Sequence, residues 1–391
     1  MRSSNLKTKI YFEGDALKRL SGLEYKKVFI IADPFIVSSG LINAVTKHLK
    51  SASIEYTVYS DVIPDPTTDK VVLGVTALMR EKSPCIIAVG GGSAIDLAKC
   101  VRLFARNLNS DYTPYFIAIP STSGTGSEVT SFAVISDPKK NIKHALVDEF
   151  LIPDEAILDV EMVKSVPATI TADTGLDVLA HALEAYVSTE ADYFSDMYAE
   201  KATSLCKHYL VRSYNYQKTR ENKAREKMHI ASCLAGIAFN AVSLGICHSI
   251  AHQLGAQFHI PHGRANAIVL PDVIGFNAGI SENTFAVKNP APCVSKYANM
   301  SRRIGLLSYN DDVACVKALA YYIRSMQVEM GMPTSVHEAV PTLTYEQYAS
   351  KFDAMAEAAL NDTCTKTNPR KPTKQDIIQI LKKIWNNDIN A

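Results

Sequence analysis

Four side chains in this sequence have the types and spacing expected of ligands to one divalent transition metal. Asp177 and His181 stand one helical turn apart in TGLDVLAHALEAYVS, where apolar residues recur with helical period, so both side chains share a helix face. His248 lies in a second helical run, and His262 follows a turn that contains proline. One carboxylate and three imidazoles suit iron, zinc, cobalt or nickel better than magnesium or calcium.

Two other interpretations of these residues stay open at the level of the sequence. Taken singly, a histidine in a helix is most often a surface residue or a hydrogen-bonded core residue. Four protein ligands can also form a closed structural zinc site, but such sites are rich in cysteine, and none of the 8 cysteines here has ligand spacing. The dispersed cysteines, without a CxxC pair, are typical of reduced thiols in the cytosol.

The order of the elements predicts an α/β domain followed by an all-helical one. At 391 residues, of which 47% are apolar, the chain can form two cores. Its first part alternates β-branched runs (28–33, 54–60, 85–91 and 115–120) with amphipathic runs (41–50, 68–81 and 93–106). This alternation predicts a doubly wound parallel sheet over residues 1–160. From Met162 onward nearly every run has helical period, so we expect helices over 161–391.

Two glycine-rich loops follow predicted strands and could bind a dinucleotide. The first is GGGS at 90–93, and the second is IPSTSGTGSEVT at 119–130. Glycines let backbone N–H groups approach a phosphate closely, and a helix N-terminus adds partial positive charge. A glycine triplet alone also occurs in plain turns, but two such loops at neighbouring strand ends suit a nucleotide along the sheet edge. The predicted contacts are Gly91, Gly92, Ser93, Asp96, Thr122, Ser123, Thr125 and Ser127.

Asp33, at the end of the first predicted strand, favours NAD over NADP. A carboxylate there can accept hydrogen bonds from the adenosine ribose and would repel a 2′-phosphate. The alternative is that Asp33 is a turn residue before Pro34. The G-x-G-x-x-G fingerprint is absent from the first strand–helix turn, so that motif gives no support to a standard Rossmann domain.

The stretches 157–184 and 245–267 resemble the two signature regions of the iron-containing, group III alcohol dehydrogenases, and the resemblance spans nearly all of the chain. It implies the dehydroquinate synthase-like fold of that family and the cofactor NAD(H). It also implies one divalent metal on Asp177, His181, His248 and His262, with Fe²⁺ favoured over Zn²⁺. GGGSxxDxxK and TSGTGSE are similar to the family's nucleotide loops, and by the same resemblance Asp65 and Lys143 are further nucleotide contacts.

Metal and nicotinamide together predict the interconversion of alcohols and aldehydes. A metal ion can polarise an aldehyde oxygen while hydride arrives. We expect His252 and His262 to be the catalytic histidines, with His252, one turn after His248, as the proton carrier. An alternative is that His252 supports the ligands from behind or replaces one of them.

The resemblance places the substrate pocket at Phe132, Phe239 and Cys364. None of these side chains is a strong partner for the second hydroxyl of a diol, so a short primary alcohol or aldehyde is favoured. LKTKIYFEG, IPDPTT and KTNPRKP are most similar to propanol dehydrogenases of propanediol-utilising bacterial microcompartments, which implies reduction of propanal to 1-propanol with return of NAD. Arg264 departs from the family, where an aliphatic residue is common, and the sequence gives no account of it.

Other functions share part of this pattern. A polyol dehydrogenase of the glycerol or propanediol type, or a dehydroquinate synthase-like cyclase, would have the same fold, and a metal-dependent hydrolase could use the same ligands. The net charge of +1 and the lack of basic runs argue against nucleic acid or membrane partners. The apolar run 230–246 is interrupted by polar residues and predicts a buried helix of the second domain.

The N-terminus has no apolar export segment, which favours a cytoplasmic protein. The resemblance further implies a homodimer or higher homo-oligomer. It also implies a place inside a microcompartment, with the shell or co-encapsulated enzymes as partners.

Overall fold

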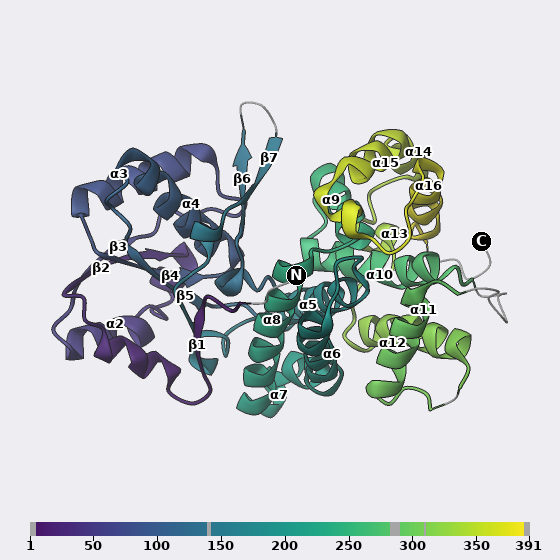
Figure 1. The fold of residues 1–391 in the computed structure, drawn as a ribbon, viewed down its shortest axis with the longest axis horizontal. Helices are drawn as coiled ribbons and strands as arrows, with labels where there is room; N and C mark the ends of the chain where they lie inside the picture. Colours follow the sequence, from purple (N-terminus) through teal and green to yellow (C-terminus); the bar gives the residue numbers. More distant parts are fainter. Residues whose placement is uncertain (1–4, 139–141, 282–289, 309, 387–391) are drawn as a thin grey trace. The chain divides into compact units, whose positions relative to one another are not determined.

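A computed structural model describes residues 5–138, 142–281, 290–308 and 310–386. By its internal contacts the chain divides into two compact units, drawn together in Figure 1. Unit 1 contains residues 1–166 and 225–240, and unit 2 contains residues 167–224 and 241–391. The first unit thus includes a segment from far along the chain, and a single boundary at residue 160 stays a prediction.

Unit 1 is built on a six-stranded parallel sheet, as the strand–helix alternation predicted. The spatial order of the strands is β1-β8-β5-β4-β2-β3, and each neighbouring pair is parallel. The strands are β1 (Lys9–Phe12), β2 (Lys27–Ala32), β3 (Glu55–Tyr59), β4 (Cys85–Gly90), β5 (Tyr115–Pro120) and β8 (Glu155–Leu158).

Helices cover both faces of this sheet. Alternate residues of each strand point to opposite faces, and on both faces they are apolar and pack against helices. In β2, Phe29 and Ile31 belong to the apolar cluster under α3 (Thr68–Glu81) and α4 (Gly92–Leu108). Val28 and Ile30 belong to the cluster on the other face. That second face is covered by η1 (Ala16–Gly22), α1 (Pro34–Ser38) and α2 (Asn43–Ser51).

The chain reverses its direction across the sheet at β2. From β2 it moves outward to the edge strand β3, and then returns to β4 on the other side of β2 before continuing to β5. In open parallel sheets the loops at such a switch point diverge and leave a crevice beyond the carboxyl ends of the strands, where ligands bind. The carboxyl ends of β2, β4 and β5 are therefore the expected binding edge of unit 1.

A second, antiparallel pair of strands was not predicted. β6 (Phe132–Asp137) pairs with β7 (Ile142–Val147), and the two strands project together from unit 1 (Figure 1). The backbone N–H of Ser136 donates to the carbonyl of Pro66, 2.8 Å away, which ties this ribbon to the loop before α3. Short one-turn helices flank the ribbon in the chain, η2 (Ser127–Val129) before it and η3 (Glu149–Leu151) after it, and a third, η4 (Val160–Met162), follows β8.

All regular elements in the described part of unit 2 are helices, joined by loops. Its central helix, α10 (His262–Ala278), packs against α5 (Ala168–Val187), α9 (Ile246–Phe258) and α12 (Asp312–Glu329), and α5 also packs against α6 (Tyr193–Tyr214). The remaining helices are α7 (Tyr216–Thr219), α11 (Pro292–Arg303), α13 (Val336–Ala339), α14 (Tyr345–Ala349), α15 (Phe352–Asn361), η5 (Thr363–Thr367) and α16 (Lys374–Lys383).

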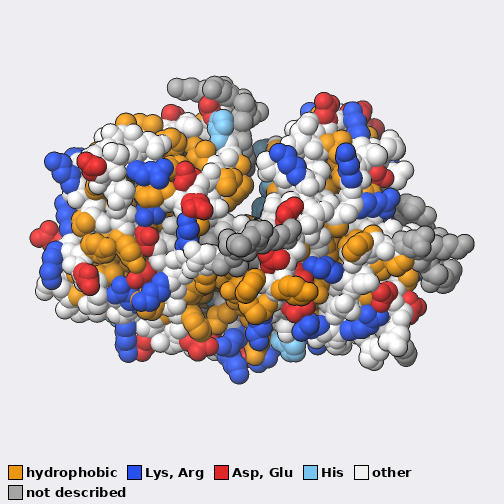
Figure 2. Space-filling model, in the orientation of Figure 1, with side chains coloured by type: hydrophobic (Ala, Val, Ile, Leu, Met, Phe, Trp, Pro, Cys, Tyr) orange, Lys and Arg blue, Asp and Glu red, His pale blue; other side chains and the backbone are white. Residues whose placement is uncertain are grey.

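The apolar run 230–246 is not one helix. It contains the end of α8 (Asn222–Val242), a break at Ser243 with φ 63°, and the start of α9. Residues 225–240 of α8 belong to unit 1, where Cys233 and Ile237 share a cluster with β1 and β8. Among the described helices none alone could cross a membrane, and α8 with α9 meets the criteria of length and composition only as a pair bent by 107°. Positive and negative side chains are interspersed over the described part of the face in Figure 2.

Candidate metal and nucleotide sites

Unit 2 brings the four predicted metal ligands together. Asp177, His181, His248 and His262 each offer one ligand atom, and these atoms all lie within 4.8 Å of one another. Asp177 Oδ1 lies 3.9 Å from His248 Nε2 and 3.6 Å from His262 Nε2. Two ligands come from α5, one from the first turn of α9, and His262 is the first residue of α10.

This donor set fits a divalent transition metal. In a tetrahedral site with bonds of about 2.1 Å, ligand atoms lie about 3.4 Å apart, so the distances of 3.6 and 3.9 Å from Asp177 need only a small contraction. Burial lowers the pKa of His248 far below its usual value, which keeps that imidazole neutral, as ligation requires. Burial raises the pKa of Asp177, but the neighbouring His181, His262 and His248 outweigh it and lower this pKa overall. The His262 side chain is 42% exposed, so the cluster is open on that side.

Asn266, on α10, shows which atoms of the histidines face the centre of the cluster. Its side-chain nitrogen donates to Asp177 Oδ1 at 2.8 Å and lies 3.1 Å from His248 Nε2 and 3.2 Å from His262 Nε2. The carboxylate takes one of the two N–H groups of this amide, so the second can be donated to only one of the two Nε2 atoms. Because an amide nitrogen cannot accept a hydrogen bond, neither Nε2 finds an acceptor for a proton there.

Glu184, which was not predicted as a site residue, lies behind His248. Glu184 Oε2 is 2.5 Å from His248 Nδ1, and Oε1 accepts from the backbone N–H of Cys247 at 2.7 Å. The side chain is 2% exposed, and burial raises its pKa to about 7. Its position three residues after His181 on the same helix face was the available signal, but a glutamate in a helix usually indicates a solvated surface.

His252 is not one of the four clustered ligands. Its ring stacks on that of His262 with centroids 5.4 Å apart, and its Nδ1 lies 2.8 Å from Asp362 Oδ2. Burial raises the pKa of Asp362, but the hydrogen bond and charge of His252 lower it to about 2 overall. The His252 side chain is 41% exposed, so it can exchange protons with solvent.

Arg264 has a structural partner that the sequence did not reveal. Its Nε and Nη2 donate to the two oxygens of Asp173, at 3.1 and 3.0 Å. Asp173 stands one turn before Asp177 on α5, so this two-pronged ion pair joins α5 to the first turn of α10 next to the metal ligands.

The predicted nucleotide loops occupy the carboxyl edge of three adjacent strands. Asp33 follows β2, Gly91 caps α4 after β4, and the second glycine-rich loop follows β5. A Cβ atom on Gly92 would lie 2.9 Å from Thr125 Cγ2, so the two loops pack closely only because this residue is glycine. Asp33 also caps α1, since its Oδ1 accepts from the Phe35 N–H at 2.9 Å. Capping the turn before α1 is therefore compatible with the predicted role of Asp33 in nucleotide binding.

Asp96 and Lys99 hold the second loop onto α4. Asp96 accepts from Ser127 Oγ at 2.6 Å and from the Val134 N–H at 3.0 Å. Lys99, whose pKa burial lowers to about 8, donates to Thr130 Oγ1 at 2.9 Å and to the Phe132 carbonyl at 2.7 Å. Asp96 and Ser127 were predicted as direct nucleotide contacts, and here they bond to each other. Their nucleotide role stays a prediction.

A second missed residue, His229 of α8, supports the same loop. Its Nδ1 lies 3.0 Å from Ser123 Oγ, and burial lowers its pKa to about 4. Gly126 also contacts α8, because a Cβ atom on it would lie 2.7 Å from Gly236 Cα. Sequence periodicity placed His229 only on a helix and gave no sign that this helix belongs with the sheet.

The remaining predicted residues are distributed over both units. Asp65 is exposed, with a left-handed backbone (φ 50°), in the loop before α3. Lys143 is in β7, and its side chain lies outside the described residues. Phe132 and Phe239 belong to unit 1 and the buried Cys364 belongs to unit 2, so the substrate pocket stays a prediction.

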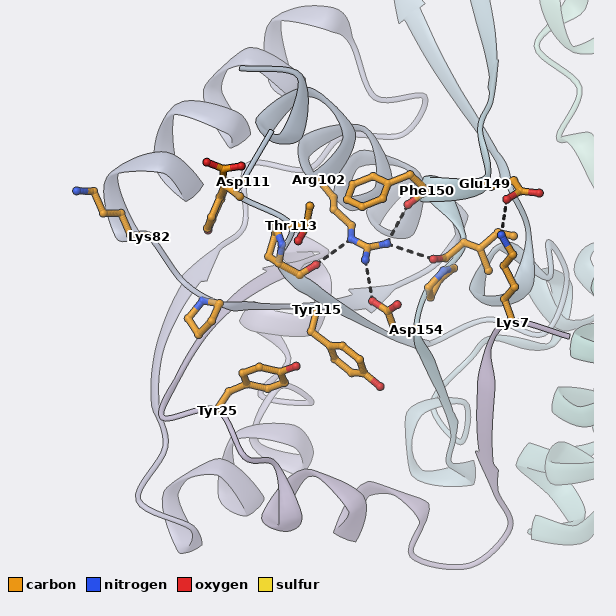
Figure 3. A pocket seen from close by; sticks show the side chains of 15 residues that line it. Lys7, Tyr25, Lys82, Arg102, Asp111, Thr113, Tyr115, Glu149, Phe150 and Asp154 are labelled. Atoms are coloured by element: carbon orange, nitrogen blue, oxygen red, sulfur yellow. Dashed lines mark hydrogen bonds and ion pairs between the residues drawn. The ribbon is translucent and has the colours of Figure 1, made fainter. Parts of the chain in front are cut away.

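A cavity of about 890 Å³ in unit 1 lies at the opposite, amino-terminal edge of the sheet. Its lining includes Pro84, Tyr115 and Asp154, at the starts of β4, β5 and β8. Figure 3 shows the guanidinium of Arg102 in this cavity bonded to backbone carbonyls and to Asp154. Because these polar groups are bonded to one another, the cavity is less suited to a nucleotide than the opposite edge.

Comparison with known proteins gives matches along almost the whole chain. Residues 7–160 match a family model described as iron-containing alcohol dehydrogenase, and residues 171–385 match one described as the C-terminal part of the Fe-containing alcohol dehydrogenase family. The 1-propanol dehydrogenase PduQ of Citrobacter freundii is 41% identical, covering 98% of this chain and 100% of the relative. An NADPH-dependent butanol dehydrogenase of Clostridium saccharobutylicum is 37% identical, covering 96% of each.

Solved structures agree with these matches. A 1,3-propanediol oxidoreductase has a TM-score of 0.88 at 28% identity, covering 98% of this chain and 100% of that chain. A sulfoacetaldehyde reductase of Bifidobacterium kashiwanohense, solved in complex with NAD⁺, has a TM-score of 0.84 at 25% identity, covering 99% of this chain and 100% of that chain.

Proposed function

This chain belongs to the iron-containing alcohol dehydrogenase family, and from that premise we propose that it uses one divalent metal and NAD(H) to interconvert propanal and 1-propanol. The observation that carries the proposal is the cluster of one carboxylate and three imidazoles in unit 2. A dehydrogenase of this kind must also bind a nucleotide, and the glycine-rich loops of unit 1 support that requirement.

The metal ligands, the cofactor and His252 have separate tasks in the proposed reaction. When bound, a divalent ion polarises the aldehyde oxygen, and a nicotinamide carries the hydride. Asp177, His181, His248 and His262 hold the ion. His252 donates its Nδ1 proton to Asp362 in the hydrogen bond of 2.8 Å, so its Nε2 is the atom that exchanges a proton with the substrate oxygen or with water.

For the cofactor, the charge of Asp33 supports NAD. The carboxylate follows β2 at the switch point of the sheet, where the adenosine ribose of a dinucleotide is bound in doubly wound folds. One of the relatives is NADPH-dependent, so the choice of cofactor varies among similar proteins and is open to a direct test.

For the substrate, the apolar candidates Phe132, Phe239 and Cys364 support a short unbranched aldehyde over a polyol. The 1-propanol dehydrogenases among the relatives support the same substrate. By the same likeness we propose a cytoplasmic homodimer or higher oligomer that works inside a propanediol-utilising microcompartment.

The test is the consumption of NADH by purified protein loaded with Fe²⁺ or Zn²⁺. We expect turnover with propanal, weaker turnover with diol or polyol substrates, and loss of turnover after chelation that the metal restores. Asp177→Asn should lower kcat/KM by a factor of about 100 to 1000, as expected for removing one electrostatic stabiliser. Turnover that survives complete removal of metal would contradict the proposal, and activity confined to polyols would favour a polyol dehydrogenase.

A further inference from the structure

Glu184 occupies a distinctive place beside the metal cluster. It lies on α5, seven residues after Asp177 and three after His181, so the three side chains share one face of that helix. Its two carboxylate oxygens are both directed at the first turn of α9. Oε1 accepts from the Cys247 N–H at 2.7 Å, and Oε2 lies 3.3 Å from the His248 backbone nitrogen and 2.5 Å from His248 Nδ1.

We propose that Glu184 is a positioning residue that holds His248 in the Nδ1–H tautomer, so that Nε2 presents its lone pair to the metal, while the same carboxylate anchors the helix that carries His248. The proposal rests on the proposed metal site. Glu184 itself does not contact the metal.

The tautomer follows from both sides of the His248 ring. On the inner side, Nε2 lies 3.1 Å from the amide nitrogen of Asn266, which cannot accept a hydrogen bond, so this contact favours a lone pair on Nε2. On the outer side, Nδ1 faces a carboxylate that already accepts from backbone N–H groups. A proton on Nδ1 satisfies both contacts, whereas a proton on Nε2 would set two donors against each other. Carboxylates behind ligating histidines commonly fix ring orientation and tautomer in this way.

The same carboxylate also fixes the position of α9. The first backbone N–H groups of a helix have no partner within it. Here Glu184 accepts from Cys247 and His248, and Asn368 Oδ1 accepts from the Ile246 N–H at 3.1 Å. A Cβ atom on Gly245 would lie 2.7 Å from Glu184 Oε1, so only glycine permits this approach. One face of α5 thus supplies two metal ligands and the support for a third.

Glu184→Gln tests the proposal because it keeps the shape of the side chain but replaces one acceptor oxygen by an NH₂ group, which is a donor. A glutamine has one acceptor oxygen, yet both Glu184 oxygens face N–H donors. If its oxygen stays on the Cys247 N–H, its NH₂ group faces Nδ1 and drives the proton of His248 to Nε2, which removes the ligand lone pair. We expect the Kd for Co²⁺, measured by competition with a chelator, to rise 10- to 100-fold, and the visible absorption of the cobalt protein to change.

Two control variants distinguish this role from a general loss of stability. Glu128→Gln makes the same substitution at another buried glutamate whose pKa burial raises to about 7, in unit 1, and should leave the Kd for Co²⁺ within about threefold of wild type. Asn368→Ala removes a different acceptor from the start of α9 and should lower the Tm with a smaller effect on Kd. An unchanged Kd in Glu184→Gln, or equal losses in all three variants, would overturn the proposal.

A measurement on the wild type covers the case in which Glu184→Gln does not fold. In the Zn²⁺-loaded protein labelled with ¹⁵N-histidine, we expect His248 to show a protonated Nδ1, and a bare Nδ1 would overturn the proposal. Failure here is distinguishable from failure of the proposed function. A protein that binds metal through this tautomer but does not turn over propanal would contradict only the function, whereas an active enzyme with an indifferent Glu184 would contradict only this inference.

Discussion

Asp33 combines a hydrogen bond within the fold with a negative charge at the nucleotide edge, and substitution can separate the two. Asp33→Asn keeps an Oδ1 acceptor for the Phe35 N–H but removes the charge. We expect the ratio of kcat/KM for NADPH to that for NADH to rise at least about tenfold, equivalent to about 1.4 kcal/mol, because repulsion of the 2′-phosphate is relieved.

Asp33→Ala is the comparison, because it removes both the charge and the cap. It should show the same change in cofactor preference and an additional loss of about 0.5 to 2 kcal/mol of stability from α1. If Asp33→Asn leaves the preference for NADH unchanged, Asp33 does not select the cofactor, and its role is limited to capping.

His229 makes the stability of the protein sensitive to mild acid. Its pKa is about 4 in the folded state, below the usual value of 6.5, because it is buried. Between pH 6.5 and pH 4 this histidine is protonated in the unfolded chain but neutral in the folded protein. A falling pH therefore favours the unfolded chain, and the folded protein loses stability as the pH falls from 6.5 towards 4. The shift is equivalent to about 3 kcal/mol. Between pH 7 and pH 4.5, wild type should lose about 2 to 3 kcal/mol more free energy of unfolding than His229→Asn.

The measurement is urea unfolding at several pH values. His208→Asn, at an exposed histidine of α6, is the matched control and should follow the wild type across the whole range. Parallel curves for wild type and His229→Asn would show that this histidine does not resist protonation in the folded state.

At the scale of elements, the contact between α5 and α10 sets the position of His262. A Cβ atom on Gly263 would lie 2.1 Å from the Asp173 carbonyl oxygen, which is backbone and cannot move aside. Gly263→Ala should therefore displace the start of α10, destabilise the protein by about 1 to 3 kcal/mol and weaken metal binding. Gly255→Ala in α9, where the nearest atom would be 3.5 Å from the new Cβ, should be neutral or slightly stabilising. Equal metal affinity in both variants would contradict this account.

The pattern of apolar residues predicted the strands that are buried on both faces and the helices that bury one face. The strands β2, β4 and β5 are continuous apolar runs, and α3 begins and ends at the predicted residues. β6 and β7 were missed because they pair only with each other, outside the strand–helix alternation, and β6 fully buries only Ala133 and Ile135 among partly exposed residues. Asp177 and His181 could be paired from their spacing within one helix. The support from Glu184 could not be predicted, because it depends on how α9 packs against α5.

At the scale of the whole molecule, each ligand should stabilise a different unit. A ligand that binds the folded state stabilises it by about 2.7 kcal/mol at a concentration of 100 times Kd. In hydrogen-exchange mass spectrometry we expect Zn²⁺ to slow exchange in α5, α9 and the first turn of α10, and NADH to slow exchange in residues 90–93 and 121–127. Protection by NADH that is confined to the metal helices would contradict the assignment of the glycine-rich loops.

The return of α8 to the sheet has a consequence for protein engineering. Because residues 225–240 belong to unit 1, the chain passes between the units three times, after residues 166, 224 and 240. A chimaera that joins the first 166 residues to the helical part of a relative would therefore graft an incomplete half, with Cys233 and Ile237 replaced by foreign side chains against β1 and β8. A successful transplant has to carry the segment 225–240 with it.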